Sequence, residues 1–210
     1  MKFQPEKLTR VMFMALGLIM FSSSHAAEKG DWLVRFGAIH VSPNDSSGTL
    51  TGAPTVGVAV DSDTQAFANI SYMLSETLAL ELLAATPFTH TISATGALSG
   101  EIATVKQLPP TLSLQHHFSP NGTVRPYAGA GINYTMFFDE QATAVINSIS
   151  LDDSWGWAAQ AGTDIEINKN WFANVDLRYI NIETTATTNL GTVDVKINPW
   201  VFSVGVGTRF

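Results

Sequence analysis

The chain has 210 residues, a formal net charge of -7 and no cysteine. The excess of acidic side chains argues against nucleic acid as a partner, because phosphate backbones attract basic surfaces. The lack of cysteine excludes disulfides and zinc–thiolate sites, so the stability of the chain must come from its fold. A chain of this length suits one domain.

The N-terminus has the three parts of a secretory signal peptide. Lys2, Lys7 and Arg10 precede an apolar run over 11–21, and the small residues of "SSSHAA" follow it. This run is too short to cross about 30 Å of hydrocarbon as a helix. We therefore predict a signal peptide at 1–26 and a mature domain at 27–210, with an uncleaved anchor as the alternative.

The rest of the chain alternates apolar and polar residues in eight segments, which is the period of β-strands. The predicted strands are 31–41, 64–74, 78–88, 104–118, 124–139, 154–168, 171–183 and 194–210. Tight turns at 75–77, 119–123 and 169–170 alternate with longer polar segments at 42–63, 89–103, 140–153 and 184–193. An even strand number with this alternation is typical of an outer-membrane barrel. We predict an all-β fold, an eight-stranded antiparallel transmembrane β-barrel with short periplasmic turns and long extracellular loops, in the cell outer membrane of a Gram-negative bacterium.

The two faces of each predicted strand differ in polarity. In 171–183, Val175 and Leu177 alternate with Asn174, Asp176 and Arg178. An Arg on the lipid face costs roughly 2–4 kcal/mol at the membrane midplane, so the charged face is predicted to line the lumen. On this basis Val175→Arg is expected to impair assembly and Asn174→Asp to be tolerated.

Aromatic residues are predicted to form a girdle at each membrane interface. The members are Trp32, Tyr72, Phe118, Trp171 and Phe210 at the short-turn end, and Phe88, Phe138, Trp155, Trp157 and Trp200 at the long-loop end.

Five stretches, in order, resemble one known family. They are "LELLAATPFTH", "IATVKQLPPTLSLQHHF", "RPYAGAGINYTMFFDE", "DSWGWAAQAGTDIEIN" and "INPWVFSVGVGTRF". The chain resembles the OmpW family of outer-membrane proteins, which includes the AlkL alkane-uptake proteins, over about residues 30–210. The resemblance implies a narrow, partly hydrophobic channel. It also implies passage of small hydrophobic molecules across the lipopolysaccharide layer, with release sideways into the membrane.

The part of the lumen near the short turns, here called the lower lumen, is predicted to hold a polar plug. Its members are Arg35, Glu81, Gln115, His117, Asp164, Glu166, Asp176, Arg178 and Arg209. Buried charges must pair or meet water. An eight-stranded barrel is just wide enough for side chains to fill it or for one small ligand, which excludes a broad aqueous pore. We interpret the plug as structural, with ion conduction as the alternative.

Inward positions become apolar towards the long loops, which predicts a hydrophobic pocket open to the outside. The pocket residues are Ile39, Phe67, Leu83, Phe137, Ile180 and Val201. The alternative is that these side chains simply fill the barrel.

Three prolines lie at similar heights on one predicted strand pair. Pro87, Pro109 and Pro110 cannot donate ladder hydrogen bonds, and proline is normally kept out of central strands. They predict a gap in the wall that serves as a lateral outlet. The alternative is a barrel rim that stands above the bilayer, where a broken ladder is harmless.

The chain is not expected to be an enzyme or to hold a cofactor or metal. His40 and His90 lie near Ser42, Asp45 and Ser93, but no ordered motif links a nucleophile to a base. His116 and His117 are adjacent on a strand, so they point to opposite faces and cannot share a metal.

The predicted function is a channel for small hydrophobic molecules. The alternative is a structural or receptor-type barrel whose loops bind partners without transport. The expected partners are the lipid bilayer and lipopolysaccharide, small hydrophobic solutes, and the periplasmic chaperones and barrel-assembly machinery that serve exported barrels.

Overall fold

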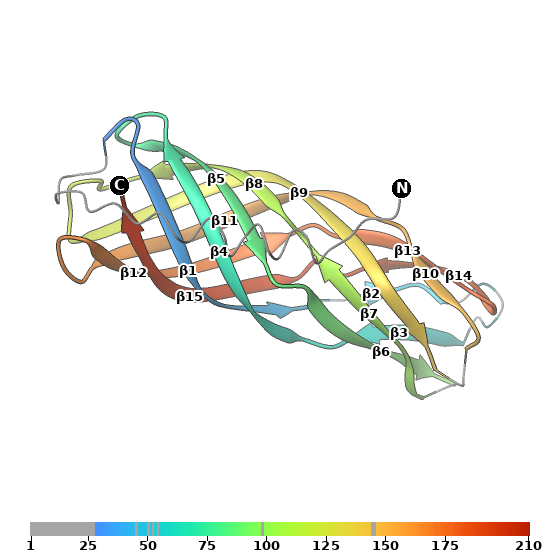
Figure 1. Cartoon of the computed structure of the whole chain (residues 1–210). Coiled ribbons are helices and arrows are strands. Elements are labelled where there is room, and N and C mark those ends of the chain that lie inside the picture. The colour runs from blue at the N-terminus through green and yellow to red at the C-terminus, as the bar shows by residue number, and fades with distance from the viewer. Residues whose placement is uncertain are drawn as a thin grey trace.

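The computed structural model describes residues 28–210, except 45, 50, 52, 54, 98, 144 and 145. The predicted signal peptide, 1–26, lies outside the described residues. Within the described part of the chain, no helix has the length and apolar character needed to cross a membrane. Strands and their connections make up this part of the molecule (Figure 1).

In chain order the strands are β1 (Trp32–Ser42), β2 (Ser46–Ser47), β3 (Val56–Val60), β4 (Asp63–Met73), β5 (Leu78–Ala85), β6 (Phe88–Gly96), β7 (Gly100–Leu108), β8 (Thr111–His117), β9 (Val124–Ala142), β10 (Ile149–Leu151), β11 (Ser154–Glu166), β12 (Trp171–Ile180), β13 (Glu183–Thr188), β14 (Gly191–Lys196) and β15 (Trp200–Arg209). The order β11-β12-β15-β1-β4-β5-β8-β9 closes into a barrel because β9 also pairs with β11. All of these pairs are antiparallel, which confirms the predicted eight-stranded barrel. The tight turns after β4, β8 and β11 lie at the same end as the C-terminus (Figure 1).

Side chains alternate between the lumen and the outer surface, as predicted. On β12 the even-numbered residues from Phe172 to Ile180 are buried, whereas Leu177 on the outer surface is 47% exposed. Leu82, Leu114 and Ile132 are likewise exposed on their strands. Exposed apolar side chains of this size are stable on a surface that meets lipid.

Aromatic side chains form contacts at both ends of this apolar surface. The upper belt, at the end opposite the short turns, consists of Tyr134, Trp155, Trp157, Tyr179 and Trp200. The ring centroids of Tyr134 and Trp155 are 4.6 Å apart. The lower belt includes Trp32 and Tyr72, whose ring centroids are 4.8 Å apart.

Phe88 does not belong to the upper girdle, contrary to the prediction. It is fully buried and faces inward. In β5 the odd-numbered residues are buried, but in β6 the even-numbered ones are. The irregular residues between these strands, Thr86 and Pro87, therefore shift the alternation by one position, as a β-bulge does.

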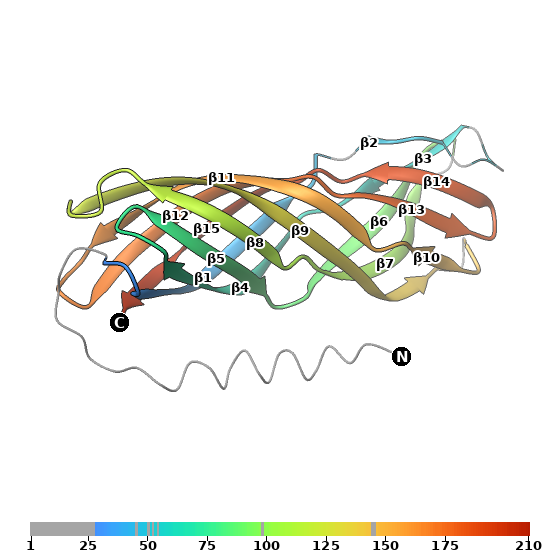
Figure 2. The same ribbon diagram turned by 90° about the horizontal axis from the view of Figure 1, so that it is seen from above.

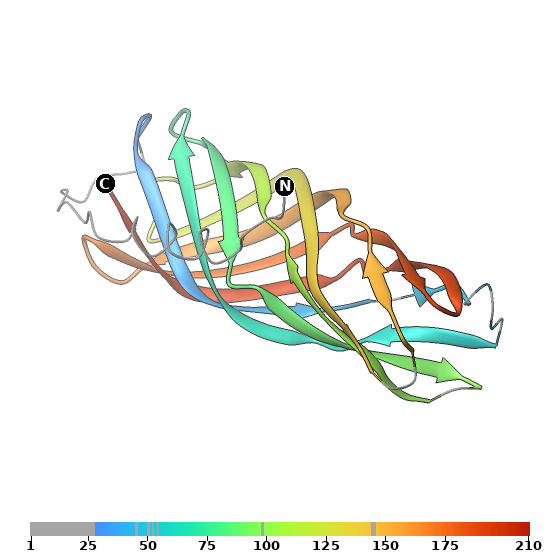
Figure 3. The same ribbon diagram turned by 45° about the vertical axis from the view of Figure 1, so that its right-hand side comes forward.

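Most of the predicted long loops 89–103 and 184–193 is strand, and 42–63 and 140–153 contain shorter strands, which corrects the assignment of these four segments as loops throughout. Beyond the upper belt the wall divides into two sheets, β9-β7-β6-β3 and β10-β13-β14-β2 (Figures 2 and 3). Their Thr- and Ser-rich sequences suggest loops, but Ile102, Val105, Val193 and Val195 are buried between the sheets. Pairing between segments far apart in the chain gives these residues a strand environment that no single segment specifies.

Candidate functional site

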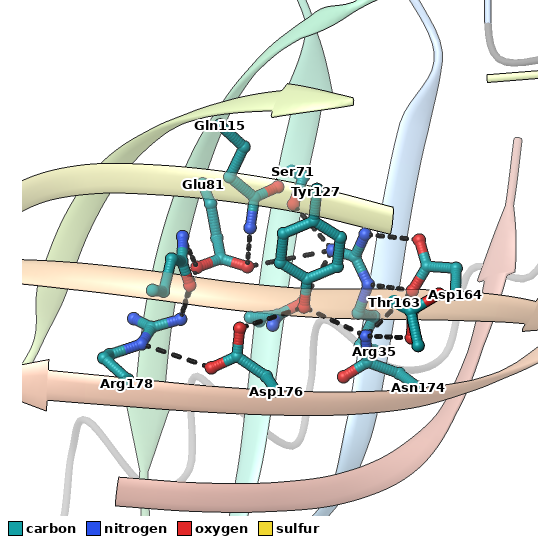
Figure 4. Close-up of polar contacts among 12 residues, drawn as sticks. Arg35, Ser71, Glu81, Gln115, Tyr127, Thr163, Asp164, Asn174, Asp176 and Arg178 are labelled. Carbon is teal, nitrogen blue, oxygen red and sulfur yellow. Dashed lines mark hydrogen bonds and ion pairs between the residues drawn. The ribbon is translucent and has the colours of Figure 1, made fainter. Parts of the chain in front are cut away.

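A network of buried charged and polar side chains closes the lower lumen (Figure 4). Arg35 of β1 forms a bidentate ion pair with Asp164 of β11, with Nε–Oδ1 and Nη2–Oδ2 distances of 2.9 and 2.7 Å. Its Nη1 also donates to Ser71 Oγ at 2.9 Å. Because β1 and β11 are not neighbours, the pair spans the interior of the barrel. Bidentate pairs of this kind are the strongest charge-assisted hydrogen bonds.

Glu81 is the second centre of the network. Its carboxylate accepts hydrogen bonds from Arg178 Nη2 at 2.7 Å, Gln115 Nε2 at 2.8 Å and Gln160 Nε2 at 3.2 Å. Its Oε2 also lies 3.7 Å from Arg35 Nη1. β5 and β12 stand on opposite sides of the barrel, so the Glu81–Arg178 pair crosses the lumen as well.

Tyr127 and Asn174 connect the two halves of the network. The Tyr127 hydroxyl donates to Asp176 Oδ2 at 3.1 Å and accepts from Asn174 Nδ2 at 3.0 Å. Asn174 Nδ2 also lies 2.8 Å from Asp164 Oδ1. The sequence analysis placed Asn174 on the inward face without assigning it to the plug, and it did not predict the roles of Gln160 and Tyr127.

An apolar floor lies beneath the network, towards the short turns. The cluster of Leu33, Met73, Ala79 and Phe172 is buried there. The Phe172 ring has the Arg35 guanidinium 5.6 Å from its centroid and the Arg125 guanidinium 5.5 Å from it. Both contacts are within cation–π range.

Two predicted plug residues, Arg209 and Glu166, lie outside the network. Arg209 Nε is 3.7 Å from Asp31 Oδ2 at the periplasmic end. Glu166 Oε2 is 3.7 Å from Arg125 Nη1, and its side chain is 38% exposed. Each is the last residue of its strand. A side chain on the inward face at that position lies at the open end of the barrel and not in the lumen. His117 is buried near the network, with its ring centroid 5.3 Å from that of Tyr127.

An apolar cavity lies above the network. This inner cavity is lined by four of the six predicted pocket residues, Ile39, Leu83, Ile180 and Val201. Ala85, Phe88 and Pro109 also line it. Phe67 is buried in the same hydrophobic cluster.

A second apolar cavity, the outer chamber, lies between the two extracellular sheets. Its lining includes Ile92, Val105, Phe137, Ile146 and Val193. The polar lining residues are His90, Gln107 and Thr188. Gln107 also lines the inner cavity, so the two spaces meet at this residue.

Strand pairing is interrupted beside the inner cavity, at what we call the wall break. The β5–β8 ladder stops at Leu83↔Thr111, and the β6–β7 ladder begins at Phe88↔Gln107. Residues 84–87 and 108–110 lie between these ladders, and they contain all three predicted outlet prolines, Pro87, Pro109 and Pro110.

Asn133 stabilises one edge of the wall break. Its buried Nδ2 donates to the carbonyl oxygens of Pro109 and Pro110, both at 3.1 Å, and lies 3.0 Å from Thr111 Oγ1. The Tyr134 N–H donates to Pro110 O at 3.1 Å, and the Tyr134 ring belongs to the upper belt. The wall break therefore lies beside the upper membrane interface. This role of Asn133 was not predicted from the sequence.

The other histidines in the described part of the chain are separated. His116 points outward with its ring 5.0 Å from Phe118, His40 Nδ1 lies 2.8 Å from Thr64 Oγ1, and His90 is buried in the outer chamber. Asp45 lies outside the described residues. Across the described ranges, no group of three or more His, Cys, Asp or Glu side chains is placed to hold a metal ion.

Comparison with known proteins agrees with this architecture. The model of the OmpW family matches residues 28–210. The chain belongs to the OmpW family. Outer membrane protein W of Vibrio cholerae serotype O1 is 44% identical over 198 residues, which cover 88% of this chain and 91% of that relative.

Two solved OmpW-like barrels have the same fold. The crystal structure of OprG from Pseudomonas aeruginosa is 39% identical, with a TM-score of 0.83 over 89% of this chain and 98% of that one. The solid-state NMR structure of AlkL in DMPC bilayers is 26% identical, with a TM-score of 0.69 over 92% of this chain and 96% of that one. The family resemblance drawn from the sequence is confirmed. This OmpW-family protein is a barrel of the Gram-negative outer membrane, and these relatives are barrel proteins rather than enzymes.

Proposed function

We propose that this OmpW-family barrel admits small hydrophobic molecules from outside the cell and releases them sideways into the outer membrane. One observation carries the proposal: the inner cavity is apolar, lies directly above the buried charge network and is bordered by Pro109 of the wall break. The same space therefore adjoins a closed floor and an interrupted wall.

The charge network opposes passage straight through the barrel. An apolar solute moving towards the periplasm would have to separate Arg35 from Asp164 and Glu81 from Arg178, leaving buried charges without partners. Uncompensated buried charges cost several kcal/mol each, and an apolar solute offers no replacement hydrogen bonds.

The wall break offers an exit with a smaller barrier. No ladder hydrogen bonds have to be broken between 84–87 and 108–110, because the described pairing already stops on either side. Irregular backbone at membrane depth is tolerated where it lines a cavity or has other partners. Here the Asn133 amide supplies partners for the Pro109 and Pro110 carbonyls.

The outer-membrane location also implies partners for the barrel. The extracellular sheets would contact lipopolysaccharide, and the chain would reach the membrane with the help of periplasmic chaperones and the barrel-assembly machinery. The competing function is a scaffold or receptor barrel. The observation on its side is the close packing of the buried cluster that surrounds both cavities.

A matched pair of substitutions tests the transport function. Ala85→Phe adds bulk to the inner cavity, whereas Ala161→Phe adds the same bulk on the outer surface of β11, away from the wall break. Uptake of a hydrophobic solute such as naphthalene by cells producing each variant should fall severalfold for Ala85→Phe alone. Heat-modifiable gel mobility verifies that equal amounts are folded. Normal uptake by a folded Ala85→Phe protein would support the scaffold function instead.

A further inference from the structure

Gln107 occupies an unusual position at the junction of the two cavities. It lies on β7, is 1% exposed and lines both the outer chamber and the inner cavity. Its neighbours in the lining, such as Ile92, Val105 and Phe137, offer no hydrogen-bonding groups. A side-chain amide on an otherwise apolar route has to be explained by the bonds that it makes.

His90 fixes the orientation of this amide. His90 Nδ1 lies 2.6 Å from the carbonyl oxygen of Asp61, which can only accept, so Nδ1 carries the hydrogen. In the neutral ring Nε2 is then an acceptor, and Gln107 Nε2 lies 2.9 Å from it. The Gln107 NH₂ group therefore donates to His90, and its Oε1 is the end that points away.

The surroundings keep His90 in this neutral form. It lies on β6, beyond the upper belt, where burial lowers its pKa from the ordinary value of 6.5. The carbonyl of Asp61 and the carboxylates of Asp61 and Asp63 act in the opposite direction but only partly offset the burial. The donor arrangement that orients Gln107 is thus maintained at neutral pH.

The oxygen of the amide is left with unused hydrogen-bonding capacity. Gln107 Oε1 is buried and has no hydrogen-bond partner among the residues that the structure describes. Buried carbonyl oxygens are normally paired, because desolvation without a hydrogen bond is unfavourable. A solute that brings a donor to this point would gain a hydrogen bond that a purely apolar solute cannot form.

We infer that Gln107 is a specificity site for hydrophobic molecules that carry a hydrogen-bond donor, such as phenols, alcohols or N–H heteroaromatics. The inference rests on the proposed function, because the solute must first enter the outer chamber. An ether or alkane of the same size would enter the apolar space but leave Oε1 unpaired. One neutral hydrogen bond corresponds to a preference of about tenfold.

A pair of matched probes measures this preference. We would titrate 2-naphthol and 2-methoxynaphthalene into the full barrel in nanodiscs, with isoleucine methyl groups labelled for NMR. Ile92, Ile102 and Ile146 report on the outer chamber. The exposed Ile132 and Ile165 on the lipid surface report partition into the bilayer. After correction for partition, 2-naphthol should bind the chamber about tenfold more tightly.

Gln107→Leu should abolish the preference while both probes still bind. Val105→Leu changes the volume of the chamber, keeps the amide and should retain the preference. If Gln107→Leu does not fold, Gln107→Met provides the same test with a flexible side chain. Equal binding of the two probes to the native barrel, or a preference that survives in the Gln107 variant, would overturn the inference. If neither probe shifts the NMR signals of the chamber isoleucines, the proposed function is contradicted together with the inference.

Discussion

At the scale of single residues, the lower lumen depends on which polar group stands at each inward position. Asn174 is neutral, yet it lies among Asp164, Asp176 and Tyr127. Its amide donates to Asp164 Oδ1 at 2.8 Å and to the Tyr127 hydroxyl at 3.0 Å. The sequence-based expectation that Asn174→Asp is tolerated considered only the face of the strand. These contacts lead us to expect the opposite outcome, because a carboxylate cannot donate and would repel its neighbours.

We therefore predict that Asn174→Asp destabilises the barrel at neutral pH. The change removes two hydrogen bonds and adds an uncompensated buried charge, which costs roughly 3–5 kcal/mol. The temperature at which the folded band disappears on unheated gels should fall markedly. Asn170→Asp makes the same chemical change in the exposed β11–β12 turn and should leave this temperature unchanged. Equal melting of both variants would show that Asn174 is not a donor in the network.

At the scale of strands, the wall break arises from two features acting together. Pro87, Pro109 and Pro110 remove backbone donors. The extra residue between β5 and β6 shifts the register, so that 84–87 on one strand face 108–110 on the other. This shift also turns Phe88 and His90 inward, which brings both residues to the cavities.

Replacing the three prolines of the wall break with valine should make the barrel more resistant to heat. Each valine restores an N–H, and a ladder hydrogen bond formed by it contributes about 1 kcal/mol. Uptake of naphthalene should decrease in the same variant, because the proposed exit would close. Pro126→Val, within the paired part of β9, is the control and should not alter uptake. A triple variant with raised stability and normal uptake would eliminate the lateral outlet.

At the scale of the whole molecule, one continuous barrel crosses two environments. Below the upper belt its outer surface is rich in exposed leucine, isoleucine and valine, such as Leu177 and Val204. Beyond that belt the outer surface carries exposed polar groups, including the Lys106–Asp139 ion pair at 3.0 Å. The change from one surface to the other defines the level at which the membrane ends.

Arginine substitutions on one face of the β12–β13 segment should locate this level. Val175→Arg places a charge in the hydrocarbon region and should cost roughly 2–4 kcal/mol, with a corresponding loss of refolding yield in lipid vesicles. Thr187→Arg lies on the same outward parity beyond the upper belt, where water is available, and should refold normally. Similar yields for the two variants would contradict the assigned membrane boundary.

The sequence predicted the eight strands of the barrel, the tight turns and, for most strands, the face that meets lipid. These properties are local, because a strand of period two reveals its apolar face at Leu177 or Val204 without knowledge of its neighbours. It also marked Arg35, Glu81 and Asp164 as inward. The pairing among them could not be predicted, since Arg35 and Asp164 are 129 positions apart and meet through barrel closure.

The extracellular sheets, the Asn133 bonds to Pro109 and Pro110, and the position of Gln107 were also decided by the tertiary structure. Each depends on the register between strands, and register is a relation between distant segments. A shift of one residue, such as the one at Thr86 and Pro87, reverses the face of every side chain that follows in the strand. The pattern within a single segment does not contain that information.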